Sequence, residues 1–448
     1  MEEKVTYQKT LKLFQVVALG LAWMSPMIYF TVYGLAYEGS KGTMTGSYSM
    51  AAAAILLTAI SYIVMSKRFS SSASAYTYVK KAIHPYAGFL VGWVVLLEYI
   101  FSPVISCLTF GLYMHAQFPD IPASLWMIGI NLIFAAVNIV GIRFSAGISK
   151  IFVVVQILFI AVFCFYLLKG LADGAAAVAV QPLLPQGDWG ISTILTGASL
   201  VCFSFLGFDT VTTLADETIN ARKTIPRAIM LIVIIASVMY IAVSMLTKLA
   251  FPSLSFSNAD AAGFELMKLV GGAGLQSLFI SVLILAVFTQ GVIAVTSASR
   301  LLHVMGTDST LPKRFFGKLH AKYKTPVNSI AVVCIVSLLA LVLSLETAIK
   351  FVSLGALTAF VFVNGSVIAQ MYVKEKKRSF TQTIVYLVVP LCGAGFAFWL
   401  LTLLDRTALF MGLCWLLVGA AYQLYRTKLA VPPFGKNVSL INRISVDE

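Results

Sequence analysis

Most of this sequence consists of apolar segments that are each long enough to cross a lipid bilayer. A spanning helix needs about 20 mostly apolar residues, and the chain is 59% hydrophobic and only 11% charged. We expect spans at residues 13–37, 46–66, 87–114, 122–142, 151–168, 191–215, 229–250, 275–299, 328–345, 348–372, 381–404 and 407–425. Barrel strands would be short and would alternate in polarity. We therefore predict an all-α membrane protein of about twelve transmembrane helices.

The lysines and arginines are concentrated on one predicted side of the membrane. The net charge is +14, and most of the 32 basic residues fall in segments that share a side with the N-terminus, including 67–86, 300–326 and the stretch after 426. Such a bias marks the cytoplasmic side. We expect a multi-pass protein of the cell membrane with both termini in the cytoplasm. The lipid bilayer then accounts for the charge, and no nucleic acid partner is needed.

Two of the predicted spans are interrupted near their middle. The first contains Met24-Ser25-Pro26, and a proline inside a helix costs about 3 kcal/mol. The sixth contains Leu206-Gly207-Phe208-Asp209, which combines a glycine with an ionisable residue. Paired interruptions are typical of transporters built from inverted repeats, although kinked membrane helices are also common. The pattern predicts one transport domain over 1–448, made of repeats 13–168 and 191–372, two added helices over 381–425 and a cytoplasmic tail 426–448.

Glu98 and Asp209 are the only carboxylates well inside a predicted span. A charge at the centre of a bilayer costs about 2.5–3.5 kcal/mol, and no lysine or arginine lies near a span centre to neutralise either acid. Each acid is then either protonated or paired with a cation from solution, such as a cationic substrate or a transported proton. The alternative is a neutral carboxylic acid that is hydrogen-bonded to a nearby carbonyl group.

Aromatic residues cluster in sequence around the two acids and the first interruption. An ammonium group over an aromatic ring gains about 0.5–2 kcal/mol, but ordinary packing is the simpler explanation for any single ring. The residues concerned are Trp93, Tyr99 and Phe101 near Glu98, Phe205 and Phe208 near Asp209, and Trp23, Tyr29 and Phe30 in the first span.

The sequence lacks the motifs of catalytic and nucleotide-binding proteins. There is no HExxH, GxSxG, Walker or dinucleotide-binding pattern, and the six cysteines form no CxxC pair. We therefore expect no enzyme activity, cofactor or metal site, and transport must draw on a gradient. The membrane potential contributes about 2.3 kcal/mol per charge per 100 mV, so a dication gains about 4.6 kcal/mol.

Several motifs resemble those of the amino acid–polyamine–organocation permeases. The signature in and after the sixth span is Gly207-Phe208-Asp209, Ala215-Asp216-Glu217-Thr218 and Ile225-Pro226-Arg227. The loop after the eighth span carries Ser299-Arg300-Leu301-Leu302, Leu311-Pro312 and Thr325-Pro326. Within the family, Ser74-Ala75-Tyr76-Thr77-Tyr78, Leu97-Glu98-Tyr99 and residues 202–209 are most similar to the putrescine importers. The resemblance implies a LeuT-type fold of two inverted halves of five helices, with substrate bound at the two breaks.

Two positions depart from the pattern of these relatives. Thr31 stands where the putrescine importers usually carry aspartate, which weakens the case for a dication. Gln156 stands where several proton-coupled members carry lysine, and an amide cannot titrate. The first span also lacks the glycine-rich stretch with which amino acid members bind a carboxylate.

The leading hypothesis is import of putrescine or a related aliphatic amine, with proton symport through Glu98 or Asp209. Its predicted substrate-binding residues are Ser25, Pro26, Tyr29, Glu98, Tyr99, Phe205, Gly207, Phe208 and Asp209. The alternatives are an amino acid permease of the same family, a sensor that binds ligand without transport, and a membrane enzyme.

Overall fold

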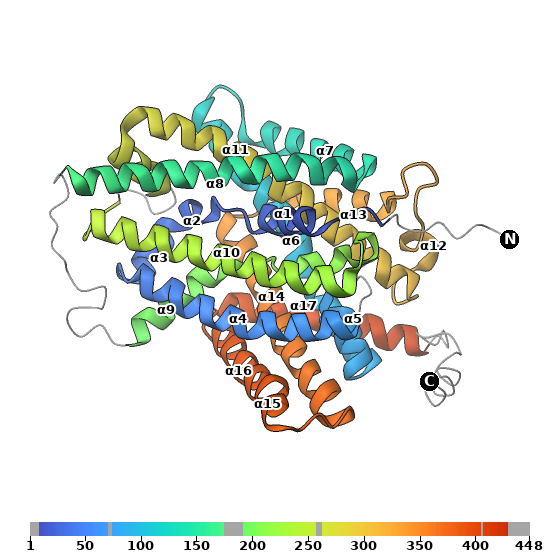
Figure 1. Cartoon of the computed structure of the whole chain (residues 1–448). Helices are drawn as coiled ribbons and strands as arrows, with labels where there is room; N and C mark the ends of the chain where they lie inside the picture. The colour runs from blue at the N-terminus through green and yellow to red at the C-terminus, as the bar shows by residue number, and fades with distance from the viewer. Residues whose placement is uncertain (1–8, 70–73, 174–190, 257–261, 405, 429–448) are drawn as a thin grey trace.

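Long helices that run side by side make up almost all of the structure (Figure 1). The computed structural model describes residues 9–69, 74–173, 191–256, 262–404 and 406–428. Within these ranges every regular element is a helix, apart from an isolated parallel bridge between Leu11 and Thr218. Eleven helical segments are apolar and long enough to cross a membrane, and the shorter apolar helix Val327–Leu341 occupies the place of the ninth predicted span. The prediction of an all-α membrane protein is confirmed.

The α-helices follow the predicted spans closely. They are α1 Leu13–Met24, α2 Ile28–Thr31, α3 Tyr33–Gly39, α4 Met44–Arg68, α5 Ser74–Ala82, α6 Pro85–Gln117, α7 Ala123–Val140, α8 Ile142–Ala172, α9 Ile191–Val201, α10 Ala221–Ala250, α11 Ala262–Thr307, α12 Lys313–Phe316, α13 Val327–Ser337, α14 Leu345–Val367, α15 Phe380–Thr383, α16 Val389–Thr402 and α17 Arg406–Lys428. Shorter 3-10 helices cover Cys202–Phe205, Thr210–Glu217 and Leu338–Leu341, and π-helical turns cover Ile368–Lys374 and Ile384–Val388.

Both predicted interruptions are present. Helix α1 ends at Met24, Ser25 has φ 50°, and α2 begins at Ile28. In the sixth span α9 ends at Val201, a 3-10 turn follows, and Gly207 has φ +105° before the next 3-10 helix. Residues other than glycine rarely adopt that φ. A Cβ atom at Gly207 would also lie 1.6 Å from Cδ1 of Trp23, so only glycine fits at this break.

The eighth and ninth spans differ from the predicted boundaries. Helix α11 starts at Ala262 rather than near residue 275. It is kinked at Gly271 and Gly272, so residues 262–270 form a separate short helix before the membrane-spanning part. The ninth span is shorter than predicted, because α13 ends at Ser337 and tightens into a 3-10 turn. The division into two inverted repeats and two added helices remains a prediction, and residues 429–448 of the predicted tail lie outside the described part of the chain.

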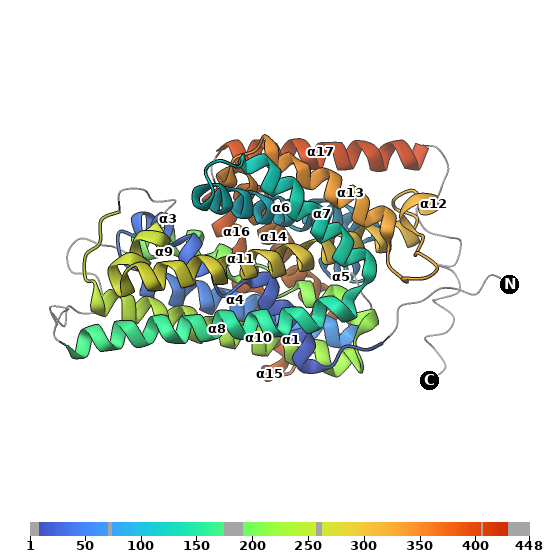
Figure 2. The ribbon, with the colours of Figure 1, turned by 90° about the horizontal axis from the view of Figure 1, so that it is seen from above.

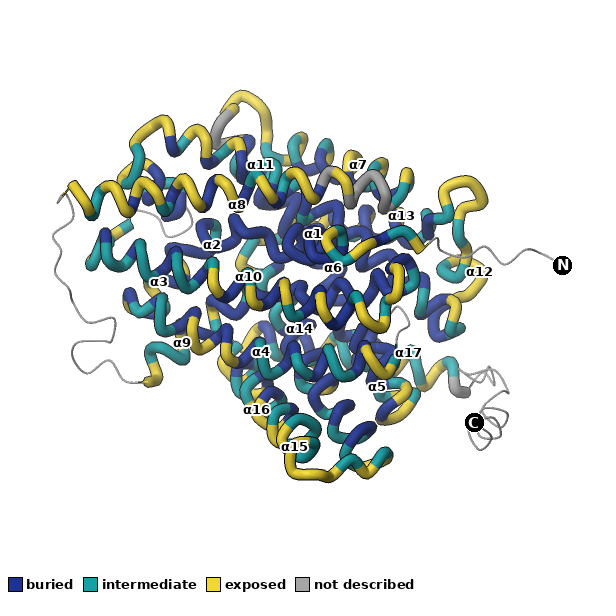
Figure 3. Tube along the Cα trace, viewed as in Figure 1, coloured by how far each residue is buried: buried dark blue, intermediate teal, exposed yellow. Residues whose placement is uncertain are grey.

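Burial is greatest in the first and third spans. In the apolar stretches of these two spans, 83% and 89% of the residues are buried, compared with 22% in that of Phe380–Thr402 and 17% in that of Arg406–Arg426. Figure 3 shows the same pattern, with α1 and α6 dark blue and α15 and α16 largely teal and yellow. Helix α17 runs along one side of the bundle (Figure 2). Ser25 at the first break and Phe205, Phe208 and Asp209 at the second are also buried, so both breaks lie in the interior, away from lipid.

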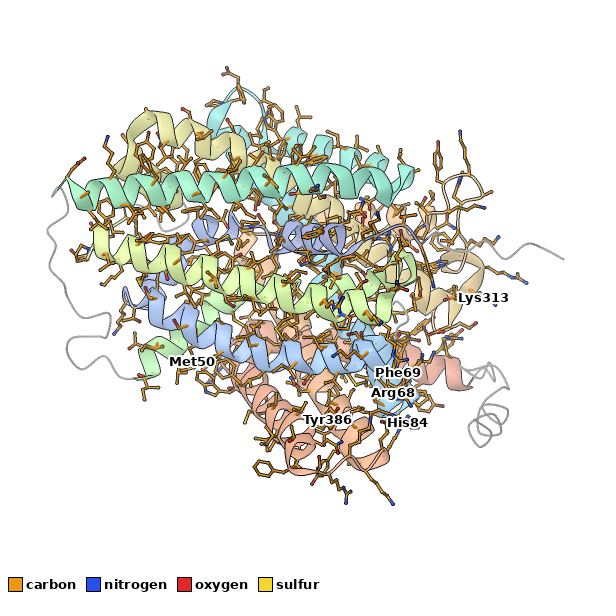
Figure 4. The ribbon with its side chains drawn as sticks, viewed as in Figure 1. Met50, Arg68, Phe69, His84, Lys313 and Tyr386 are labelled. Atoms are coloured by element: carbon orange, nitrogen blue, oxygen red, sulfur yellow. The ribbon has the colours of Figure 1, made fainter. Side chains whose placement is uncertain are left out.

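One end of the bundle carries a group of basic side chains. Arg68, His84 and Lys313 lie at this end, whereas Met50 lies nearer the other (Figure 4). Helix α4 ends here with Lys67 and Arg68, and α5 ends with Lys80 and Lys81. We call this end of the bundle the basic end.

Candidate functional site

Asp209 lies at the centre of a buried cluster of tyrosines. Tyr99 of α6 donates to Oδ2 of Asp209 at 3.1 Å, and Tyr62 of α4 donates to the same oxygen at 3.4 Å. Ser74 of α5 lies 3.1 Å from the Tyr99 hydroxyl. Asp209 and the two tyrosines are fully buried. Two phenol donors partly compensate a carboxylate that has lost its water, but they add no positive charge.

The carboxylate of Glu98 lies beside this cluster. Among the described residues, neither of its carboxylate oxygens is hydrogen-bonded, and Oδ1 of Asp209 is also unpaired. The backbone at Glu98 is held tightly against α14, where a Cβ on Gly355 would lie 2.6 Å from the Glu98 nitrogen. Glu98 and Asp209 are close enough to interact electrostatically. No lysine or arginine in the described part of the chain forms an ion pair with either acid.

A second polar group joins the first break to two other spans. Ser25 donates from Oγ to Oε1 of Gln156 at 3.3 Å, and Nε2 of Gln156 lies 3.5 Å from Oγ1 of Thr289. Gln156 thus bridges α1, α8 and α11 as a neutral amide. Trp23, one turn before the break, covers Gly207 and meets the edge of Tyr99 with ring centroids 5.5 Å apart. The two breaks are therefore in direct contact.

Tyr240 of α10 connects the backbones of both breaks. Its hydroxyl lies 3.4 Å from the carbonyl oxygen of Ser25 and 3.2 Å from that of Ser204. Tyr48 lies beside it, with its hydroxyl 3.4 Å from Oγ of Ser204. The rings of Tyr29, Tyr48, Phe205 and Tyr240 pack together, with Tyr48 and Tyr240 centroids 5.4 Å apart. The Ser25 carbonyl also accepts from the N–H of Ile28 at 2.9 Å, so the Tyr240 phenol adds a side-chain donor to backbone carbonyls at both breaks.

We expect Tyr240→Phe to lower the stability of the folded protein by about 1–3 kcal/mol, because the buried carbonyl of Ser204 loses its side-chain donor and that of Ser25 loses its second donor. Thermal unfolding in detergent would measure this loss. Tyr425→Phe is the control, since the Tyr425 side chain is 65% exposed on α17. Equal melting temperatures for the two variants would show that the hydroxyl does not hold the breaks.

The site is closed at both ends of the bundle. At the basic end, the N–H groups of Thr10 and Leu11 donate to the carbonyl oxygen of Glu217, and Glu217 forms a buried ion pair with Arg300 at 2.6 Å. At the other end, the helix over 262–270 covers the second half of the first span, where Gly263 lies against the Phe30 carbonyl. The structure is therefore an occluded state.

The chain matches one protein family over nearly its full length. The profile described as amino acid permease covers residues 14–428. The chain belongs to this amino acid permease family. The permease is 36% identical over 429 residues to the low-affinity putrescine importer PlaP of Escherichia coli (strain K12), covering 95% of each chain. It is 27% identical to a methylthioribose transporter and 26% identical to the branched-chain amino acid permease BcaP, both of Bacillus subtilis (strain 168), covering 94% of each chain. It is a gradient-driven transporter rather than an enzyme.

The structure brings together most of the predicted site residues of the permease. Glu98, Tyr99 and Asp209 form the acid cluster, and Phe208 packs on Tyr62 with ring centroids 5.4 Å apart. Around the breaks lie Ser25, Pro26, Tyr29, Phe205 and Gly207. Among the described residues no group of three or more His, Cys, Asp or Glu side chains is suited to a metal ion.

Two of the aromatic residues that lie near Glu98 in the sequence pack elsewhere. Trp93 does not line the acid cluster, because its ring stacks on Trp415 of α17 with centroids 4.8 Å apart. Phe101 stacks on Phe351 at 4.4 Å. Conversely, Tyr62, Ser74 and Tyr240 contact the site and were not predicted. Ser74 lies in the motif Ser74-Ala75-Tyr76-Thr77-Tyr78, which was the one sequence signal that pointed to α5.

Proposed function

We propose that the permease imports putrescine or a related aliphatic amine into the cell. The observation that supports this most directly is the pair of fully buried acids, Glu98 and Asp209, which have phenol neighbours but no cationic partner in the described part of the structure. Burying an unpaired carboxylate is costly unless a cation arrives to offset it. An alkyl ammonium group supplies that charge, and the aromatic rings around the breaks suit its methylene chain. The name of the relative at 36% identity supports the same substrate class.

The proposal includes the orientation of the permease and its coupling ion. The basic end would face the cytoplasm of the cell membrane, since positive residues are retained on that side, and both termini would lie there. One of the two acids would carry a proton while the other holds the substrate, because two adjacent carboxylates do not both ionise easily in a dry site. Gln156 is neutral, so coupling would not pass through that position.

An amino acid permease is the second candidate, because BcaP is a relative over 94% of the chain. The first break offers little to a substrate carboxylate, however. Pro26 has no N–H group, and the N–H of Ile28 already donates to the Ser25 carbonyl at 2.9 Å. Two buried acids nearby would also repel a carboxylate. The geometry therefore favours an amine without a carboxyl group.

Uptake of labelled putrescine into proteoliposomes with an inside-negative potential tests the proposal. We expect saturable uptake that excess unlabelled aliphatic amines abolish and that leucine or arginine at the same concentration leave unchanged. A second arm applies an inward proton gradient without a potential, and faster uptake there would support proton symport. Competition by amino acids alone would favour the second candidate. Ligand-induced thermal stabilisation without uptake would indicate a sensor.

A further inference from the structure

Helix α17 lies outside the ten predicted core spans, yet it is attached firmly to the span that carries Glu98. Trp93 of α6 and Trp415 of α17 stack with their planes 17° apart. Each indole Nε1 donates to the other residue's carbonyl oxygen, at 2.9 and 2.7 Å. Gly419 leaves room for this contact, because a Cβ there would lie 2.5 Å from Cδ1 of Trp93. A reciprocal pair of hydrogen bonds between two stacked rings leaves little freedom for one helix to slide along the other.

The last turns of α17 reach the turn that follows α11 at the basic end. The carbonyl oxygen of Thr310 accepts from Nη1 of Arg426 at 2.6 Å and from the Tyr422 hydroxyl at 3.3 Å. The Tyr422 ring also stacks on Trp93, with centroids 6.1 Å apart. The bond from a guanidinium is charge-assisted and stronger than one between neutral groups. Arg426 thus holds the turn 308–311 in place.

The same turn holds α5. Oδ2 of Asp308 accepts from Nζ of Lys80 at 2.6 Å and from the Tyr76 hydroxyl at 2.8 Å. Burial, and then the charge of Asp308, raise the pKa of the Tyr76 phenol, so it remains a neutral donor at any physiological pH. Tyr76 lies two residues from both Ser74 and Tyr78, and Lys80 lies two residues from Tyr78; Ser74 and Tyr78 are the residues of α5 that contact the tyrosines of the acid cluster.

Helix α5 in turn supports the donors of Asp209. Ser74 lies 3.1 Å from the Tyr99 hydroxyl, and Tyr78 meets the ring of Tyr62 at 6.1 Å between centroids. Tyr99 and Tyr62 are the two residues that donate to Asp209. Hydrogen bonds and ring contacts therefore run without a gap from Arg426 through the turn and α5 to the candidate substrate site.

We infer that Arg426 is a positioning residue for substrate binding, acting through Thr310, Asp308 and α5 on the tyrosines that orient Asp209. Helix α17 is then a brace between α6 and α5, rather than a passive addition to the bundle. A substrate site must hold its groups within fractions of an ångström, and supporting contacts of this kind provide that precision. The inference rests on the proposed function in that the transported amine is its probe.

The test compares Arg426→Gln with Arg378→Gln in the uptake assay. Arg378 is a matched control, because it is exposed and likewise donates to a backbone carbonyl oxygen, that of Tyr372 in the π-helical turn after α14. We expect KM for putrescine to rise about three- to ten-fold in Arg426→Gln, the range for one hydrogen bond, with Vmax per folded transporter nearly unchanged. Arg426→Lys keeps a cationic donor and should restore most of the affinity. A KM equal to that of the control would overturn the inference.

A double-mutant cycle separates the relay from a general loss of structure. If Arg426 acts through α5, its substitution should add little once Ser74→Ala has removed the contact between α5 and Tyr99. If the two substitutions instead raise KM independently, so that their factors multiply in the double mutant, Arg426 does not act through α5. If Arg426→Gln folds poorly, Tyr422→Phe is the alternative variant, because it removes the other donor to the Thr310 carbonyl. It should also raise KM, and an unchanged KM would again refute the inference. Absence of amine uptake by the unmodified permease would instead refute the proposed function.

Discussion

Putrescine uptake should fall at least about a hundred-fold in Asp209→Asn and in Glu98→Gln, because breaking a buried ion pair costs about 3–5 kcal/mol. Both substitutions keep the size of the side chain and remove only its charge. The amine would then enter a dry site that has lost either its negative partner or the carboxyl group that carries the proton. Initial rates in proteoliposomes at several substrate concentrations would measure the loss.

The stability of these variants distinguishes loss of binding from loss of fold. Without substrate the two acids are buried and unpaired by any cation, so neutralising one should leave the melting temperature unchanged or raise it. The stabilisation that saturating putrescine gives the unmodified protein, about 2.7 kcal/mol at a hundred times Kd, should disappear. Glu346→Gln is the control, because Glu346 is an exposed acid paired with Lys350. Normal uptake by Glu98→Gln would remove that residue from the site.

The features that could be predicted from the sequence are those with a strong local signal. Long apolar runs predicted the helices, and Pro26 and Gly207 predicted the breaks, because these residues disrupt helix geometry wherever they occur. Glu98 and Asp209 stood out for a similar reason, since ionisable groups are rare at membrane depth. Exposing an ionisable group to lipid is costly, so both acids are confined to the interior of the bundle, where they lie near each other.

The residues that were missed have no such signal. Tyr62 and Tyr240 are single tyrosines in apolar helices, and nothing nearby in the sequence shows that their hydroxyls reach Asp209 or the break carbonyls. Their roles arise from contacts with residues far apart in the chain. Trp93 packs away from Glu98 because five residues along a helix correspond to a rotation of about 140°, which places the two side chains on nearly opposite faces.

The ninth span was predicted at full length because its composition is uniformly apolar, whereas α13 ends at Ser337. Hydropathy measures only the preference for lipid, and it does not register where a helix tightens into a 3-10 turn. The helix over 262–270 was missed for the opposite reason. It is amphipathic and separated from the membrane part of α11 by Gly271 and Gly272, so its apolar run is too short to be recognised as a membrane span.

Gly263→Ala should slow transport strongly while leaving the first step of substrate binding possible. In the occluded structure a Cβ at this position would lie 2.2 Å from the backbone oxygen of Phe30, which cannot rotate away as a side chain would. Overpacking of this kind costs about 1–3 kcal/mol, which corresponds to roughly 5- to 150-fold fewer closed molecules. Closure at the end opposite the basic end should therefore become limiting, and uptake should fall by a similar factor.

The control lies in α11 beyond the kink at Gly271 and Gly272, and it isolates the effect of closure. Replacing glycine by alanine stabilises a helix by about 1 kcal/mol, and this gain is shared by Gly274→Ala, where a Cβ would meet no atom within 4 Å. Gly274→Ala should therefore transport normally. The buried Cys202, beside the sixth-span break, reports the state of the protein. A membrane-impermeant thiol reagent applied from outside should modify it faster in Gly263→Ala, as measured by peptide mass spectrometry. Equal labelling and equal uptake in the two variants would show that residues 262–270 do not close the site.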